Sequence, residues 1–321
     1  MRNSKHCVVL GGTGFVGREI VNQLSARGYS ITIPTRNCEQ AQELYVNPQV
    51  KLAAADVHNQ ESLASVIGDA GVVINLVGIL NEEGHHRGRG FYVAHRDLTK
   101  TVIDVCQQLA VPRLLQMSAL KASSKNGPSD YLKSKGEAED AIRAIGKGLP
   151  GWTIFQPSVI FGPDDGFMNR FAGLLKIAPF MPLARPNARF APVYVNDVAA
   201  AFVAALDNPD TIGKTYQIGG PKVYSLRELV AYVRQLLGLK RPIIGLPDAL
   251  ARLQARIFGM VPGKPFSMDN FRSLTVHSIC DTDGLAELGI DATPLEVIAP
   301  TYLTRGGRNA HFDQLRKSAG R

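Results

Sequence analysis

The sequence of 321 residues has few of the features that mark secreted, zinc-binding or membrane-spanning proteins. Its four cysteines are widely spaced, with no Cys-x-x-Cys pair and no cysteine–histidine spacing suited to zinc. Long apolar runs are also missing, because the segment 72–80 has only strand length, whereas a spanning helix needs roughly 20 residues. We therefore expect reduced cysteines, no metal site and no transmembrane helix.

Room for a leader ahead of the fold is also small, because an apolar strand is predicted to begin at His6 or Cys7. We expect neither a signal peptide nor a transit sequence, and hence a cytoplasmic protein. The net charge of +8 comes partly from the segment after residue 304, which has five cations and one aspartate. No helix-turn-helix, zinc-finger or aromatic RNA-binding pattern accompanies them, so we predict no nucleic-acid partner. An anionic cofactor or an anionic membrane surface is the interpretation we retain.

The sequence does contain a regular alternation of short β-branched runs with helical patterns. Such alternation is typical of βαβ units on a parallel sheet. The strand-like runs span residues 6–10, 30–33, 50–54, 72–77, 113–117 and 152–155. Because 45% of the residues are hydrophobic, the chain can build a large core. We predict an α/β fold with a doubly wound parallel sheet and a smaller, interleaved α/β lobe.

The sharpest local pattern is Leu-Gly-Gly-Thr-Gly-Phe-Val-Gly at residues 10–17, between the first strand and a predicted helix. In such a turn one glycine permits the bend and another lets the backbone approach a pyrophosphate. A third glycine lets helix and strand pack closely, while the helix N-terminus offers N–H donors. The pattern predicts a Rossmann-type dinucleotide-binding unit. The residues expected at the cofactor are Gly11, Thr13, Gly14, Phe15, Val16 and Gly17.

The end of the second strand bears on which dinucleotide is bound. An acidic residue there would bind the ribose 2′-hydroxyl of NAD, whereas an arginine accommodates the 2′-phosphate of NADP. Residues 34–37 contain no acid, but they include Arg36. We predict NADP(H) as the preferred cofactor, and NAD(H) if Arg36 is only a solvated residue at a strand end.

Later strand ends should supply the remaining cofactor contacts. Asp56, after the third strand, is expected to hydrogen-bond the adenine, or else to cap the following helix. The other positions predicted to line the cofactor are Val57, Leu76, Val77, Gly78, Lys135, Pro157 and Val159.

A second chemical pattern is the pair Tyr131 and Lys135, which lie one turn apart on one face of a predicted helix. An ammonium near a phenol favours the phenolate, so we expect a lowered pKa for Tyr131 and a role as acid or base. Lys135 would also hydrogen-bond the nicotinamide ribose. Ser118, after the fifth strand, would hold the substrate oxygen against the phenol. The alternative is a solvent-facing pair without function.

In this order, the glycine turn, the serine and the Tyr-x-x-x-Lys helix resemble the short-chain dehydrogenase/reductase superfamily, in its extended or atypical branch. The segments 156–163 and 192–198 extend the resemblance, although Gln156 stands where relatives commonly carry arginine. The segment 285–303 is similar to the end of one subgroup. That subgroup is typified by the nucleotide-binding accessory subunit of mitochondrial respiratory complex I and its bacterial relatives. The resemblance covers most of the chain.

The resemblance implies two functions of different kinds. With Ser118, Tyr131 and Lys135 all present, it implies an oxidoreductase, or a sugar-nucleotide epimerase or dehydratase, acting on a small molecule that the sequence does not identify. The subgroup implies instead a non-catalytic accessory or assembly protein of complex I or quinone-linked metabolism. Its partner would be a respiratory complex or a membrane surface, and it would lie peripherally on the inner face of the membrane.

The domain boundaries follow from a change of composition after Pro157, where the chain becomes rich in proline and glycine. We predict an NADP(H)-binding Rossmann domain at 1–157, to which 190–218 return. Segments 158–189 and 219–303 are predicted to form the substrate lobe, and 304–321 a basic tail.

Three other features carry weaker predictions. His85 and His86, in the polar loop 81–90, lack the spacing to bind one metal and are interpreted as surface residues near the nicotinamide. His95 is expected to pack or cap. The segment 241–266 is predicted to contain an amphipathic helix that either packs on the substrate lobe or docks onto a membrane or partner subunit.

Overall fold

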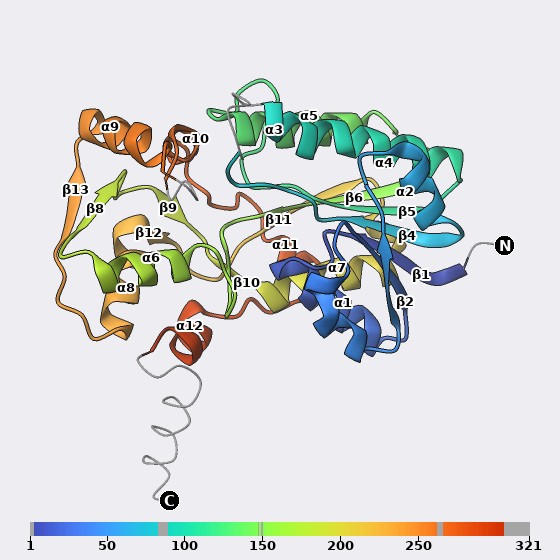
Figure 1. Cartoon of the computed structure of the whole chain (residues 1–321), viewed down its shortest axis with the longest axis horizontal. Helices are drawn as coiled ribbons and strands as arrows, with labels where there is room; N and C mark the ends of the chain where they lie inside the picture. Colours follow the sequence, from blue (N-terminus) through green and yellow to red (C-terminus); the bar gives the residue numbers. More distant parts are fainter. Residues whose placement is uncertain (1–2, 83–88, 147, 149, 262–265, 305–321) are drawn as a thin grey trace, which may run out of the picture.

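The computed structural model describes residues 3–82, 89–146, 148, 150–261 and 266–304 (Figure 1). The loop histidines His85 and His86 and the tail from residue 305 lie outside the described residues. In the described part of the chain, no helix is both long and apolar enough to cross a membrane. The same residues contain no cluster of three or more side chains able to hold a metal ion. All four cysteines are free thiols.

A seven-stranded sheet forms the centre of the molecule, and all of its strands are parallel. Its strands are β1 (Asn3–Leu10), β2 (Ser30–Thr35), β3 (Val50–Ala54), β4 (Ala70–Asn75), β5 (Arg113–Met117), β6 (Gly151–Pro157) and β11 (Lys214–Ile218). The order β11-β6-β5-β4-β1-β2-β3 runs outward in both directions from β1 and β4. This reversal opens a crevice at the carboxyl ends of β1 and β4, where dinucleotides bind in doubly wound sheets.

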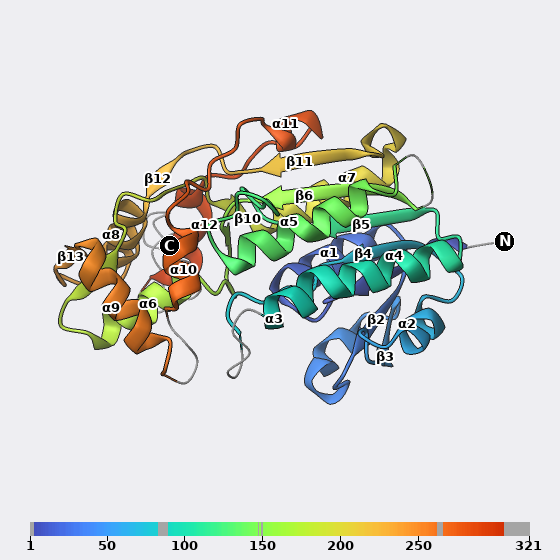
Figure 2. The same cartoon turned by 90° about the horizontal axis from the view of Figure 1, so that it is seen from above.

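Helices cover both faces of the sheet (Figures 1 and 2). One face carries α2 (Gln60–Ile67), α3 (Arg89–Tyr92), α4 (Leu98–Gln108) and α5 (Asp130–Arg143), and the other α1 (Phe15–Ala26), α7 (Val195–Asp207) and α11 (Gly284–Glu287). On the second face, Phe202 of α7 packs on Phe155 of β6 with ring centroids 4.1 Å apart. A 3-10 helix, η1 (Glu39–Val46), lies between β2 and β3. A π-helical turn, η2 (Val93–Asp97), joins α3 to α4.

The second lobe is built from short strand pairs and helices. Its strands are β8 (Met181–Ala184) paired with β13 (Ile243–Leu246), and β9 (Arg189–Phe190) paired with β12 (Tyr224–Ser225). Its helices are α6 (Met168–Ile177), α8 (Leu226–Leu236), α9 (Asp248–Phe258), α10 (Met268–Ser273) and α12 (Leu295–Leu303). A capping box begins α8, because Ser225 and Glu228 bond each other's backbone N–H groups.

The chain passes between the two lobes more than once. β7 (Ile160–Phe161) pairs with β10 (Val193–Tyr194) at the crossing, and α7, η3 (Pro209–Thr211) and β11 then rejoin the sheet layer. Leu285 of α11 also enters the core beneath the sheet. The predicted fold class, a Rossmann-type parallel sheet with an interleaved smaller lobe, is therefore confirmed.

Candidate functional site

The glycine turn between β1 and α1 has the geometry of an anion cradle. Gly11 has a φ of +77°, and the Gly14 N–H donates to the Gly11 carbonyl at 3.0 Å. A Cβ on Gly17 would lie 2.3 Å from that carbonyl oxygen, so only glycine allows α1 to begin this close to the turn. Gly14 is the N-cap of α1 and no side chain caps the helix. Its first N–H groups can therefore donate to a phosphate.

The loop after β4 packs beside the glycine turn. A Cβ on Gly11 would lie 3.3 Å from the backbone of Leu76 and Val77. A Cβ on Gly78 would lie 3.0 Å from the Lys135 Nζ atom. The predicted residues of this loop thus lie between the glycine turn and the predicted catalytic lysine.

The other residues of the glycine turn are held by their neighbours. The Thr13 carbonyl accepts a hydrogen bond from Arg18 Nε at 3.1 Å, and the Val16 side chain packs against the core. The Phe15 ring would lie 3.1 Å from a Cβ on Gly162, at the entry to the second lobe. Gly12 was missed, although it adjoins Gly11 in the sequence. A Cβ on it would lie 3.0 Å from Ile33 of β2.

Pro157 is the last residue of β6, and Val159 follows it at the carboxyl edge of the sheet. The Pro157 carbonyl accepts a hydrogen bond from the Leu120 N–H at 3.0 Å, and the Val159 carbonyl accepts one from the Val193 N–H at 3.0 Å. Both carbonyls are therefore used to connect chain segments, and a ligand here would meet the side chains instead.

Arg36 and Asp56 follow the neighbouring strands β2 and β3 and are both exposed. The Asp56 carboxylate accepts the His58 N–H at 3.0 Å. Asn59 is the residue that caps α2, so the alternative in which Asp56 caps this helix is wrong. Val57 is partly buried against the core. The structure thus leaves Arg36 and Asp56 at one exposed edge of the sheet.

Ser118 directly follows β5 and is buried, with 3% of its surface exposed. Its N–H donates to the Phe155 carbonyl at 2.7 Å. Its hydroxyl has no hydrogen-bond partner among the described residues. A buried hydroxyl without a partner costs about 1–3 kcal/mol, so this atom is suited to a ligand oxygen.

Lys135 reaches the same strand end from α5. It is 4% exposed, and its Nζ donates to the Met117 carbonyl, next to Ser118, at 3.2 Å. Burial lowers the pKa of Lys135 to about 8, and the nearby Glu139 carboxylate opposes this shift. An ammonium has three N–H donors, and the carbonyl uses one of them. Lys135 is therefore placed to donate to a ligand as well.

Tyr131 lies in an aromatic cluster one turn before Lys135. Its ring meets His95 edge-on, with centroids 5.5 Å apart at 84°, and meets Phe91 at 6.1 Å and 73°. Burial, followed by the Asp269 carboxylate, raises the pKa of Tyr131 to about 12. The expected lowering of this pKa by Lys135 is therefore wrong for the protein without ligand. The phenol therefore keeps its proton at neutral pH.

Asp269, from α10 of the second lobe, was missed by the sequence analysis. Its carboxylate accepts the N–H groups of Asp130 at 2.7 Å and Tyr131 at 3.3 Å, at the start of α5. A carboxylate at a helix N-terminus is favoured by the exposed N–H groups and the helix dipole. Ser273 of α10 adds a bond of 2.8 Å to Ser129, which caps α5. The second lobe thus holds the helix that carries Tyr131.

His95 lies in the π-helical turn η2, a feature often found at functional sites. Its Nε2 accepts the Ile79 N–H at 3.1 Å, and its Nδ1 lies 2.8 Å from the Ser134 hydroxyl oxygen. Burial, then Lys135, lowers the pKa of His95 to about 2. The neutral ring therefore carries its proton on Nδ1 and joins the loop after β4 to α5. The sequence predicted packing or capping for this residue but neither of these bonds.

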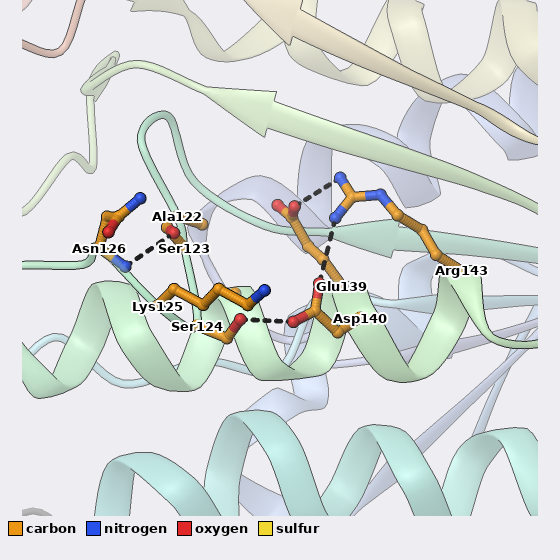
Figure 3. A pocket seen from close by; sticks show the side chains of 9 residues that line it. Ala122, Ser123, Ser124, Lys125, Asn126, Glu139, Asp140 and Arg143 are labelled. Atoms are coloured by element: carbon orange, nitrogen blue, oxygen red, sulfur yellow. Dashed lines mark hydrogen bonds and ion pairs between the residues drawn. The ribbon is translucent and has the colours of Figure 1, made fainter.

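Gln156, the departure from the family pattern, is bonded within the protein. Its amide donates to Glu139 Oε1 at 2.7 Å. The other oxygen of Glu139 accepts from Arg143 at 2.7 Å, and Figure 3 shows this pair beside Asp140. Glu139, Asp140 and Arg143 line part of a cavity of about 340 Å³. The buried carboxylate thus has Arg143 as its cation, and Gln156 supplies a neutral donor.

Comparisons with known proteins place this site in a family. The sequence profile of an NAD(P)H-binding family matches residues 11–209. The mitochondrial NADH dehydrogenase [ubiquinone] 1 alpha subcomplex subunit 9 of Mus musculus is 30% identical over 92% of this chain and 79% of its own. A ceramide reductase of Caulobacter vibrioides is 26% identical over 75% of this chain and 73% of its own.

A solved structure shows the same fold. The Bordetella bronchiseptica enzyme WbmH, in complex with NAD+, superimposes with a TM-score of 0.71 over 94% of this chain and 96% of its own, at 17% identity. The profile match spans more than half of the chain, and the 30% identity extends over nearly all of it. The chain therefore belongs to the NAD(P)H-binding family of short-chain dehydrogenase/reductase fold that includes subunit 9 of the NADH dehydrogenase alpha subcomplex.

Proposed function

We propose that the protein is an NADP(H)-dependent oxidoreductase that uses Ser118, Tyr131 and Lys135. The observation that carries the proposal is the buried Ser118 hydroxyl, which has no partner among the described residues. Next to it, the Met117 carbonyl accepts from Lys135 at 3.2 Å. A substrate carbonyl or hydroxyl oxygen would complete the bonding of this hydroxyl.

The protonation states of Tyr131 and Lys135 favour reduction of a carbonyl group over oxidation of an alcohol. A bound nicotinamide supplies or accepts the hydride. Ser118 donates a hydrogen bond that orients the substrate oxygen. Tyr131, with a pKa of about 12, holds a proton that it can donate to this oxygen as the alcohol forms. The Lys135 ammonium then stabilises the phenolate that remains.

The catalytic proposal is tested by following NADPH oxidation with a panel of carbonyl compounds that includes lipid ketones and keto sugar nucleotides. Tyr131→Phe should lower kcat by at least about 100-fold and leave nucleotide affinity unchanged, since it removes the proton donor alone. Tyr232→Phe, which removes a phenol from α8 of the second lobe, serves as the control. Full turnover by Tyr131→Phe would rule out the assigned role.

The cofactor preference is a separate part of the proposal. Arg36 is exposed at the end of β2, where a 2′-phosphate would lie, and no carboxylate of residues 34–37 competes for a 2′-hydroxyl. Calorimetry should therefore show tighter binding of NADPH than of NADH. Arg36→Ala should weaken NADPH at least tenfold and leave NADH unchanged, while Lys51→Ala, an exposed cation on β3, should change neither. Equal affinities in the wild type would contradict the assignment.

A second function is favoured by the 30% identity with the NADH dehydrogenase subunit over 92% of this chain. In that case the protein is a non-catalytic accessory or assembly protein of a respiratory complex, and the nucleotide stabilises its fold. Ligand at 100 times its Kd would add about 2.7 kcal/mol of stability without turnover. Affinity purification from membranes should then recover NADH dehydrogenase subunits equally with wild type and Tyr131→Phe. If the wild type turned over and Tyr131→Phe did not, the protein would be an enzyme and not a non-catalytic accessory protein.

A further inference from the structure

Helix α9 presents its large apolar side chains outward. The residues that it buries are two alanines, Ala251 and Ala255, which are 0% and 1% exposed. The larger Leu250, Leu253 and Ile257 are 52%, 52% and 47% exposed. Packing on the second lobe, which the sequence left open, therefore accounts for the alanines but not for the leucines and the isoleucine.

The exposed apolar residues continue beyond the end of the helix, through Met260 at 79% and Val261 at 43% exposure. Spacings of three and four residues place Leu250, Leu253 and Ile257 along one side of α9. We refer to Leu250, Leu253, Ile257, Met260 and Val261 as the α9 stripe. At 1.5 Å per residue, its helical part from Leu250 to Ile257 is about 10 Å long.

The surface around the α9 stripe is positively charged. Arg252 and Arg256 alternate with its residues and are both exposed. Between residues 240 and 261 the sequence has four cations and one carboxylate. That carboxylate, Asp248, is ion-paired with Arg185 at 2.6 Å. Neither arginine has an ion-pair partner among the residues that the structure describes. An apolar ridge bordered by such cations is the pattern of helices that lie in a lipid–water interface.

We propose that the α9 stripe docks onto an anionic phospholipid bilayer. Figures 1 and 2 show α9 at the outer end of the second lobe, away from the sheet, where a flat surface can reach it. The apolar side chains would enter below the headgroups while the exposed Arg256 extends to the phosphates. Arg252, whose guanidinium lies 5.8 Å from the Phe271 ring centroid, adds positive charge beside them. A second copy of the chain would match the apolar residues but would oppose the cations with its own, whereas acidic headgroups match both.

The test is flotation of the full-length protein with phosphatidylglycerol-containing vesicles and with phosphatidylcholine vesicles. The wild type should bind the anionic vesicles and lose binding at high salt. The double variant Leu253→Ser/Ile257→Ser should bind at least tenfold more weakly, and Arg252→Gln/Arg256→Gln about fivefold more weakly per arginine. Ile212→Ser/Val297→Ser removes residues 47% and 59% exposed outside α9 and should bind as wild type.

Several outcomes would overturn the proposal. The basic tail is present in every variant. If Leu253→Ser/Ile257→Ser bound vesicles as strongly as the wild type, vesicle binding would be assigned to the tail and not to the α9 stripe. Absence of wild-type binding to anionic vesicles would exclude a bilayer. A dimer in sedimentation that this variant abolishes, without vesicle binding, would assign the stripe to a second copy. Unchanged thermal unfolding and NADPH affinity of the variants establish that the fold is intact.

Discussion

Replacing Lys135 by methionine should stabilise the ligand-free protein at pH 7. Burial lowers the pKa of Lys135 from an ordinary 10.5 to about 8. Each pKa unit corresponds to about 1.4 kcal/mol, so keeping this buried amine charged costs about 3 kcal/mol. Methionine fills a similar volume without charge. It gives up the bond to the Met117 carbonyl, worth about 1 kcal/mol, which leaves an expected gain of about 2 kcal/mol.

The gain should disappear at high pH. Between about pH 8 and pH 10.5, the unfolded chain binds more protons at Lys135 than the folded chain does. Wild-type stability therefore rises with pH across this window through this group. Lys135→Met has no such group, so its advantage should shrink above pH 8 and reverse by pH 10.5. Below pH 8 the difference should be constant, because the lysine is charged in both states.

Urea unfolding followed by far-UV circular dichroism at pH 7 and pH 10 measures both effects. Lys133→Met removes a partly exposed cation from the same helix and should change stability by less than about 0.5 kcal/mol. A Lys135→Met protein that is less stable than wild type at pH 7 would refute the reasoning. So would a difference that does not depend on pH, since the cost would then not come from the charge. Carbonyl reduction should be lost in Lys135→Met in every case.

Further substitutions test individual contacts. The Cβ of Gly17→Ala would lie 2.3 Å from a carbonyl oxygen. This variant should lose NADPH binding in calorimetry, and its free energy of unfolding in urea should fall by about 2 kcal/mol. The control Gly173→Ala places its Cβ in open space within α6, and its free energy of unfolding should rise by about 0.5–1 kcal/mol. Asp269→Asn should lower the pKa of Tyr131, because the carboxylate that raises it is lost; an unchanged ultraviolet phenol titration would contradict this. His95→Phe leaves the Ile79 N–H without its acceptor, while the Ser134 hydroxyl keeps its bond to the Tyr131 carbonyl. It should cost about 1–3 kcal/mol in urea unfolding.

The parts of the molecule that the sequence predicted well depend on local chemistry. The glycine turn is specified within eight residues, because its close contacts join β1 to the first turn of α1. The capping box of α8 is likewise complete within four residues, from Ser225 to Glu228. Parallel strands buried on both faces also read as continuous apolar runs, and β4, from Ala70 to Asn75, is buried throughout. For these reasons the strand-like runs and the fold class could be predicted without a structure.

The electrostatics of Tyr131 could not be predicted in the same way. Burial is the larger cause of its raised pKa, and the carboxylate that adds to it, Asp269, lies 138 positions later in the chain and reaches α5 through the docking of α10. The expectation of a lowered pKa used Lys135 alone, because only that charge is near in the sequence. His95 was similarly underestimated, since its partner Ser134 is 39 positions away. Long-range contacts thus determine the protonation of the site even though local patterns identify its members.

These long-range contacts also connect the two proposals. Asp269 lies on α10, which receives α9 on one side and the start of α5 on the other. Phe271, on the same short helix, lies under the guanidinium of Arg252, 5.8 Å from its ring centroid. A bilayer bound by the α9 stripe would therefore lie one helix away from Tyr131. This placement suits a carbonyl substrate that enters from the membrane, while the nucleotide enters from water at the glycine turn. Lipid ketones are accordingly the first compounds to test with NADPH.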